Sequence, residues 1–329
     1  MKKLLLASTA LVATAGFAAA DVAISGGAEM GVKREAGADR TEFHTDISVT
    51  FTMSGESDNG LSFGAKIGLE EAQDGVATDI EDDYTVFVSA GAAKLTMGDT
   101  DGAFDKALTE VGIGSSLADD HTSHAGYNGN SGLDGAEDGQ VARFDYTFSG
   151  VTLSISAEID DDGETAATAV DADPSDGVIA AAVAADTNDN PVWGIGVAYS
   201  AELAGLDLGV GLGYQSQADN GTRTGISLST KFDNGLQAII NYSKMSPETG
   251  DDSTHSAIGF GYSANALTVG LNYGVNTTDG DEVSSGLGLA VNYDLGGGLS
   301  AQFGFGSSQY KASGTDDTDS FSLGLAMSF

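Results

Sequence analysis

Carboxylates are the side chains with the most evident chemistry in this sequence. Its 329 residues include 49 Asp or Glu but only 13 Lys or Arg, which gives a net charge of -36. One stretch, residues 99–139, carries the acidic residues Asp99, Asp101, Asp105, Glu110, Asp119 and Asp120. Rings of carboxylates favour the passage of cations, whereas a charge of this sign repels phosphate backbones. We therefore expect no nucleic-acid partner.

Calcium binding is a second chemistry that carboxylates support, because hard oxygen ligands suit Ca²⁺. The candidate ligands are Asp119, Asp120, Asp82 and Asp83. Simple solvation of acidic loops in a salty medium explains the same residues without a metal. We expect no required cofactor, with calcium as the one metal that the chain would suit.

Catalysis has few candidate residues. The chain has no cysteine and only four histidines, and no Gly-x-Ser-x-Gly sequence presents a serine nucleophile. His121 and His124 have a spacing that could ligate a metal, but no third ligand accompanies them. The sequence therefore does not predict an enzyme.

The first twenty residues predict export from the cytoplasm. Lys2 and Lys3 precede an apolar stretch that ends in Ala18-Ala19-Ala20. This is the pattern of a secretory signal peptide cleaved after Ala20. We expect residues 1–20 to be the signal peptide and 21–329 the mature domain.

Most of that domain alternates between apolar and polar residues with a period of two. Leu267, Val269, Leu271, Tyr273 and Val275, for example, alternate with Thr268, Gly270, Asn272 and Gly274. A soluble β-sandwich also alternates, but its strands average about five or six residues. Most segments here approach the ~10 residues with which a tilted strand crosses a bilayer, and aromatic residues often end their apolar side. The pattern favours a transmembrane β-barrel.

Sixteen strands are expected. They are 22–34, 42–54, 60–72, 83–90, 93–98, 140–149, 150–160, 191–201, 204–217, 221–233, 235–246, 253–264, 266–277, 282–294, 298–310 and 318–329. Short turns should alternate with mostly longer acidic connections, as in outer-membrane barrels. Those longer connections are 35–41, 73–82, 99–139, 161–190, 246–252, 278–281 and 311–317. Within 99–139, the spacing of Phe104, Leu108 and Val111 predicts a helical turn.

Several stretches in order along the chain resemble the general porins of alphaproteobacteria, the Rhodobacter type. They include Phe51-Thr-Met-Ser-Gly55, Lys94-Leu-Thr-Met-Gly-Asp99, Glu110-Val-Gly112 and Leu287-Gly-Leu-Ala-Val-Asn-Tyr-Asp-Leu-Gly-Gly-Gly298. The resemblance implies an all-β, sixteen-stranded antiparallel barrel that is an integral outer-membrane homotrimer with a water-filled pore in each subunit. Residues 99–139 would be the third external loop, folded inward as the constriction, and 161–190 a long external loop. Terminal Phe329 would be the signal read by the barrel assembly machinery, and outer-membrane lipid and lipopolysaccharide would surround the barrel.

The pore wall departs from the family pattern. Where related porins carry wall arginines, the lumen-facing positions here hold Glu29, Asp46 and Ser48. The basic candidates that remain on the wall include Lys33, Lys66, Lys94 and Arg143, of which we expect the last three at the constriction. Each could instead be a solvated lumen residue away from the constriction.

These residues predict a general diffusion porin for small hydrophilic solutes and ions, with a preference for cations. An outer-membrane adhesin or structural barrel, whose external loops would matter more than its lumen, is the main alternative. A barrel enzyme is the less favoured one.

Overall fold

The computed structural model describes residues 21–70, 81–118, 124–127, 129–136, 140–159, 190–203, 205–311 and 314–329, with backbone only at 81–83. The expected signal peptide, nearly all of the external loop at 161–190, Asp119, Asp120 and the side chains of Asp82 and Asp83 lie outside the described residues. No helix in the described ranges is long and apolar enough to cross a membrane.

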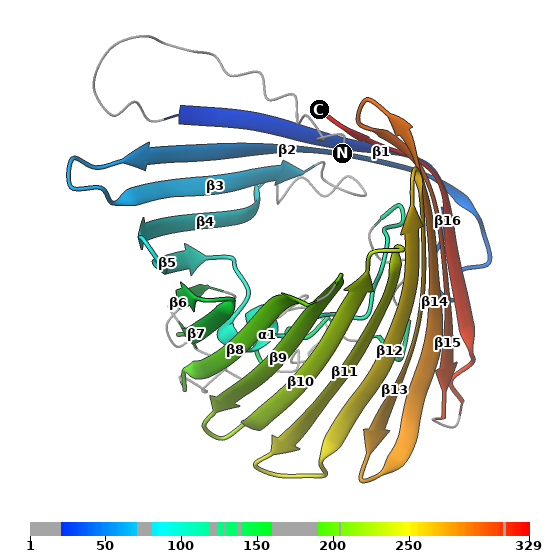
Figure 1. Ribbon diagram of the computed structural model, residues 1–329. Helices are drawn as coiled ribbons and strands as arrows, with labels where there is room; N and C mark the ends of the chain where they lie inside the picture. The colour runs from blue at the N-terminus through cyan, green and yellow to red at the C-terminus, as the bar shows by residue number, and fades with distance from the viewer. Residues whose placement is uncertain are drawn as a thin grey trace, which may run out of the picture.

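Sixteen antiparallel strands close into one barrel (Figure 1), as predicted. They are β1 Asp21–Arg34, β2 Glu42–Glu56, β3 Ser62–Glu70, β4 Glu81–Ala90, β5 Ala93–Gly98, β6 Val141–Phe148, β7 Val151–Glu158, β8 Val192–Leu203, β9 Leu206–Gln217, β10 Gly221–Phe232, β11 Leu236–Pro247, β12 Ser253–Ala264, β13 Leu267–Thr278, β14 Asp281–Gly296, β15 Leu299–Tyr310 and β16 Thr318–Ser328. One short helix, α1 Ala103–Ala107, lies between β5 and β6. Each strand pairs with its neighbours in sequence, and β1 pairs with β16 to close the barrel.

The two faces of each strand differ as the alternation predicts. On β10, Ile226 and Leu228 face outward and are 42% and 44% exposed, whereas Ser227 between them is buried on the lumen side. On β13, Leu271 and Tyr273 face outward while Asn272 points into the barrel. An apolar outer surface and a polar lumen are what a bilayer on one side and water on the other require.

On the side predicted to carry mostly longer loops, one connection is shorter than predicted and another is the short one that the predicted strand bounds imply. The connection predicted at 278–281 is a two-residue turn, Asp279-Gly280, and β9 joins β10 through residues 218–220. Asp219 and both residues of the Asp279-Gly280 turn adopt positive φ angles of 64°, 52° and 84°. Asp and Gly tolerate this backbone conformation in tight turns.

Placing a charge on the outer face should cost far more than placing it in the lumen. We predict that Leu228→Arg destabilises the folded barrel in lipid by about 2–4 kcal/mol, because the guanidinium would lie at mid-strand depth in hydrocarbon. Ser229→Arg, at the next position on the lumen side, should leave stability nearly unchanged. Denaturant unfolding in lipid vesicles measures both, and equal losses would contradict the assignment of the two faces.

Candidate functional site: the inward loop and the pore wall

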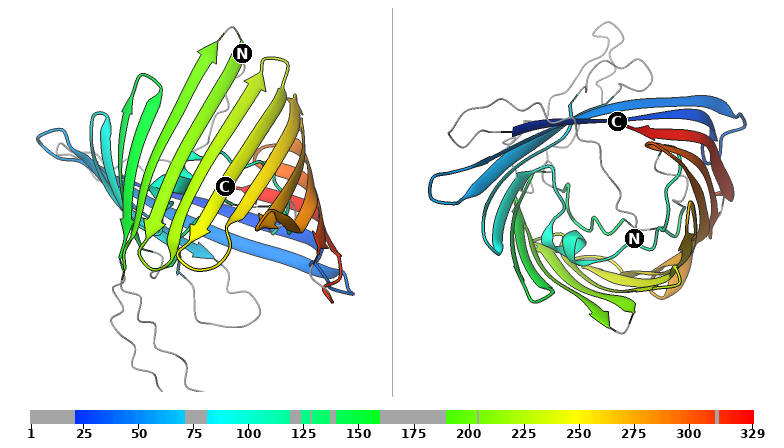
Figure 2. Two further views of the ribbon diagram at one scale, coloured as in Figure 1. Left: turned by 90° about the horizontal axis from the view of Figure 1, so that it is seen from below. Right: turned by 45° about the horizontal axis from the view of Figure 1, so that its top comes forward.

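The described residues between 99 and 136, here called the inward loop, fold into the barrel and follow its inner wall (Figure 2). The outgoing arm, residues 99–118, begins at β5 and places α1 against β7, β8 and β9. Wall side chains accept hydrogen bonds from its backbone N–H groups, with these pairs in chain order: Ala103 to Ser156 Oγ at 2.8 Å, Thr109 to Ser227 Oγ at 2.8 Å, Ser115 to Asn292 Oδ1 at 2.9 Å and Ala118 to Glu29 Oε2 at 2.8 Å. The arm therefore runs around the lumen from β7 to β1.

The return arm, residues 124–127 and 129–136, leads back along the same wall. His124 Nε2 lies 2.7 Å from Asn272 Oδ1 on β13, and Asn241 on β11 donates to Asn130 Oδ1 at 3.0 Å. Leu133 N donates to Gln215 Oε1 on β9 at 2.7 Å. The loop thus lines the wall twice, and its backbone polar groups find partners among wall side chains, as buried backbone groups must.

Several lumen glycines lie where the backbone of the loop comes closest to the wall. A Cβ added at Gly196, Gly211, Gly259 or Gly270 would overlap the carbonyl oxygen of Ala103, Ala107, Val111 or Ile113, respectively. The alternation in the sequence shows only that these glycines lie on the lumen side. At these four positions the structure gives a specific reason for glycine, because any side chain would prevent the loop backbone from approaching the strand so closely.

The predicted helical turn is shorter than its spacing suggested. Helix α1 ends at Ala107, so Leu108 follows as its C-cap and Val111 lies beyond the helix, at a bend. Phe104 is fully buried, and both Phe104 and Leu108 lie over Gly225 on β10. Val111 packs with Ile113, Ile239 and Ala257 instead. The apolar spacing therefore marks contacts with the wall rather than one continuous helix.

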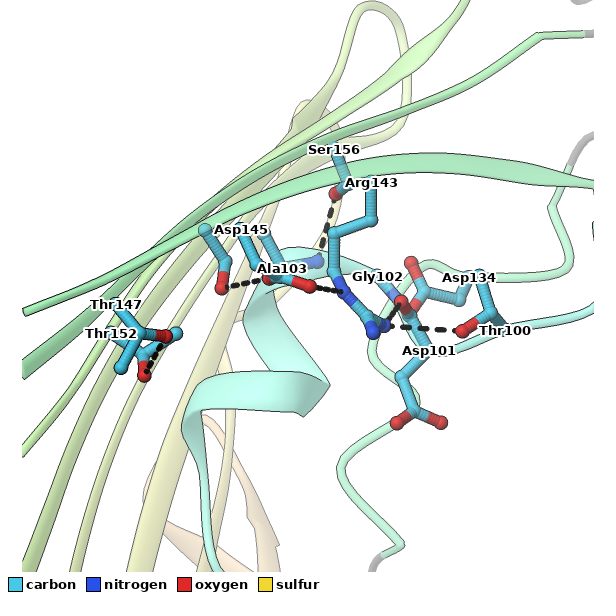
Figure 3. A network of polar contacts seen from close by, with 11 residues as sticks. Thr100, Asp101, Gly102, Ala103, Asp134, Arg143, Asp145, Thr147, Thr152 and Ser156 are labelled. Atoms are coloured by element: carbon cyan, nitrogen blue, oxygen red, sulfur yellow. Dashed lines mark hydrogen bonds and ion pairs between the residues drawn. The ribbon is translucent and has the colours of Figure 1, made fainter. Parts of the chain in front are cut away.

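Arg143 on β6 anchors the start of the outgoing arm (Figure 3). Its Nη1 donates to Thr100 Oγ1 at 3.2 Å and to the backbone oxygen of Asp101, and its Nε donates to Asp145 Oδ2 at 3.1 Å. Asp145 Oδ1 in turn accepts a hydrogen bond from Ser154 Oγ at 2.6 Å. Arg143 is 5% exposed, so the structure places it behind the loop rather than on the pore surface.

The other predicted wall residues lie in three places. Glu29, Asp46, Ser48 and Lys66 line one cavity of about 320 Å³ on the wall formed by β1–β3. Lys94 lies apart from them, at the short β4–β5 turn, with its Nζ 4.6 Å from the centre of the Phe87 ring. Lys33 forms an ion pair with Glu35 at 2.6 Å.

Glu29 also has a second role that the sequence did not reveal. Its Oε2 accepts from Ala118 N and lies 3.0 Å from Nε2 of buried His44 on β2. Glu29 therefore clamps the far end of the outgoing arm to the wall. The wall residues Ser156, Gln215, Ser227, Asn272 and Asn292, which hold the rest of the loop, carried no sequence signal beyond their lumen-side position.

Carboxylates of the inward loop repel one another at close range. Burial, together with the charges of Asp101, Glu110 and Asp134, raises the pKa of Asp105 to about 8. Burial likewise raises the pKa of Asp134 to about 6, although Gly102 N donates to this carboxylate at 2.8 Å. Glu110 Oε2 accepts from the Tyr127 hydroxyl at 2.6 Å. Asp105 and Asp134 are therefore loop carboxylates whose charge can change near neutral pH.

Two predicted acidic residues remain to be placed. Asp101 is exposed at the start of the outgoing arm, next to α1. Asp99 directly follows β5, and its backbone N–H donates to the Tyr84 carbonyl at 2.9 Å, so it belongs to the end of the ladder. Within the described ranges, no three His, Asp or Glu side chains are grouped closely enough to hold a metal ion.

Sequence comparison with known proteins finds similarity to porins. Residues 7–313 match the model of a family described as Gram-negative porin. A porin of Rhodobacter capsulatus is 30% identical over 302 residues, which cover 85% of this chain and 92% of that protein.

Solved structures agree on the fold. One structure, described as porin, has a TM-score of 0.66 at 22% identity and covers 94% of this chain and 100% of its own. A triple mutant of Rhodopseudomonas blastica porin has a TM-score of 0.62 at 20% identity, with the same coverage of both chains.

A methyl group beneath α1 should narrow the pore. We predict that Gly211→Ala lowers single-channel conductance, because the new Cβ would overlap the Ala107 carbonyl and push the outgoing arm toward the pore axis. Gly209→Ala is the matched control on the same strand and face, since its Cβ would meet only the Ser229 side chain. Equal conductance for the two variants in planar bilayers would contradict the packing described above.

Proposed function

The chain belongs to the Gram-negative porin family and is a porin of the bacterial outer membrane; from that premise we propose that its pore is a general diffusion pore selective for cations. The family and fold are those of channels rather than enzymes. The proposal concerns the sign of the charge that a permeating ion meets.

The charge balance at the constriction carries this proposal. The outgoing arm carries Asp101, Glu110 and, once it is deprotonated, Asp105, against one basic residue, Lys106. On the wall lie Glu29 and Asp46. Lys66 is the one basic residue that lines the wall cavity with the last two. Arg143 contributes little to the balance because Asp145 neutralises it.

An excess of fixed negative charge in a narrow pore attracts cations and repels anions. The low-dielectric walls of the barrel concentrate this field inside the lumen. Small hydrophilic solutes would then be sorted by size and charge as they pass the loop.

Several properties of the whole protein belong to the same proposal. Residues 1–20 would be removed after export, and the mature chain would assemble as a homotrimer surrounded by lipid and lipopolysaccharide. Phe329, which is exposed, exchanges backbone hydrogen bonds of 2.9 and 3.3 Å with Gly26 and would be the residue presented to the barrel assembly machinery. Calcium bound by Asp119, Asp120, Asp82 or Asp83 would be an accessory rather than a requirement.

A salt gradient tests the selectivity. With KCl more concentrated on one side of a planar bilayer, the zero-current potential should have the sign expected for a pore that prefers K⁺ over Cl⁻. Asp46→Asn combined with Asp101→Asn should reduce its magnitude, because each removes a charge that faces the pore. Asp39→Asn, in the connection between β1 and β2, is the control for a charge away from the constriction. A potential of the opposite sign in the unmodified protein would refute the proposal.

The selectivity should also depend on pH in a range where ordinary carboxylates no longer titrate. Asp134 and Asp105, with pKa values of about 6 and about 8, lose their protons as pH rises from about 5 to about 9. Each lost proton adds a negative charge, so cation preference should rise across this range. In Asp105→Asn the upper part of the rise should be missing. An unchanged titration in that variant would show that Asp105 does not contribute.

A further inference from the structure

A separate cavity of about 230 Å³ lies between the return arm and the inner wall, at the ends of β10–β14 that adjoin residues 248–252 and the Asp279-Gly280 turn. Tyr127 of the return arm and the strand residues Arg223, Ser253, His255 and Asn276 contribute to its lining. No carboxylate is among the described residues that line it, although the chain as a whole is strongly acidic. It is a different cavity from the one that Glu29, Asp46 and Lys66 line, although the Tyr127 hydroxyl donates to Glu110 of the outgoing arm.

Arg223 supplies a positive charge to this cavity without a matching negative one. Four other basic side chains of the described residues form ion pairs: Lys33 with Glu35, Arg143 with Asp145, Lys244 with Asp252 and Lys311 with Glu282. In the described part of the chain, Arg223 has no carboxylate within ion-pair distance, and its buried Nε has no hydrogen-bond partner. A partly buried guanidinium is costly unless an anion accompanies it.

His255 supplies a second unpartnered group. It is 4% exposed, and its Nε2 lies 2.9 Å from the Gly126 carbonyl oxygen. A carbonyl can only accept, so Nε2 carries the hydrogen and Nδ1 of the neutral ring is left as an acceptor. Nδ1 has no partner among the described residues. The cavity thus combines a cationic donor with an unfilled acceptor.

We propose that this cavity binds a hydrogen phosphate group, free or carried by a small solute. Its anionic oxygens would pair with the Arg223 guanidinium, which is suited to recognising phosphate. Its protonated oxygen would donate to His255 Nδ1, a contact that a carboxylate, with no hydrogen at neutral pH, does not offer. The Ser253 hydroxyl on the cavity wall adds a donor. The site lets the pore hold a phosphate at its mouth although its acidic constriction repels anions.

Phosphorus NMR tests this binding directly and independently of ion flow. Inorganic phosphate is titrated with the purified porin in maltoside micelles, whose headgroups contain no phosphate, and line broadening gives a dissociation constant. Arg223→Gln should weaken binding by about tenfold or more, the loss typical of a hydrogen-bonded charge. Lys231→Gln is the matched control, because it removes the same charge from the same face of β10 but lies outside the cavity.

The outcomes separate this inference from the pore proposal. Wild-type and Lys231→Gln porin that broaden the phosphate line, with Arg223→Gln porin that does not, would support the site, provided that all three conduct in KCl. A wild-type porin that leaves the phosphate line unchanged, or equal broadening by all three proteins, would overturn the site. Failure of the wild type to conduct would count against the diffusion pore instead.

Discussion

Closure of the backbone hydrogen-bond ladder is the constraint on which the rest of this structure depends. Hydrocarbon offers no partner for N–H or C=O groups, so a sheet in a membrane cannot leave an open edge. Here β1 and β16 pair from Gly27 opposite Ser328 to Arg34 opposite Phe321. Because closure gives every strand one face toward lipid and one toward the lumen, it explains both the apolar outer surface and the polar interior in which an irregular segment can be held.

The polar side chains of the lumen give the backbone of the inward loop the hydrogen-bond partners that regular secondary structure would otherwise provide. Its backbone donors meet Ser156, Ser227, Asn292 and Gln215 on the wall, and glycines leave room where its carbonyls approach most closely. Arg143 and Glu29 fix the outgoing arm at its two ends. Arg143 is buried behind the loop and paired with Asp145, which is why the number of basic wall residues overstates the positive charge that an ion meets.

The strands could be predicted from the sequence because each depends on local alternation; β12, Ser253–Ala264, matches its expected range at both ends. The path of the inward loop could not be predicted in the same way. Alternation assigns Gly211 or Arg143 to the lumen side, but it does not say whether water or another segment of the chain lies there. The apolar spacing of Phe104, Leu108 and Val111 correctly indicated that these side chains are buried, but α1 ends before Val111. The barrel wall supplies the packing that a longer helix would otherwise provide.

A disulfide between loop and wall would test the central claim most directly, and the chain has no cysteine of its own. The Ala103 Cβ lies 3.4 Å from a Cβ placed on Gly194, close to the separation of about 3.5–4.5 Å found in disulfides. In the double variant Ala103→Cys, Gly194→Cys, the account predicts that the disulfide forms in the membrane-embedded protein and that single-channel conductance is the same before and after reduction. Free thiols under oxidising conditions, or a conductance that changes markedly when the bond is reduced, would show that the loop does not lie along the wall.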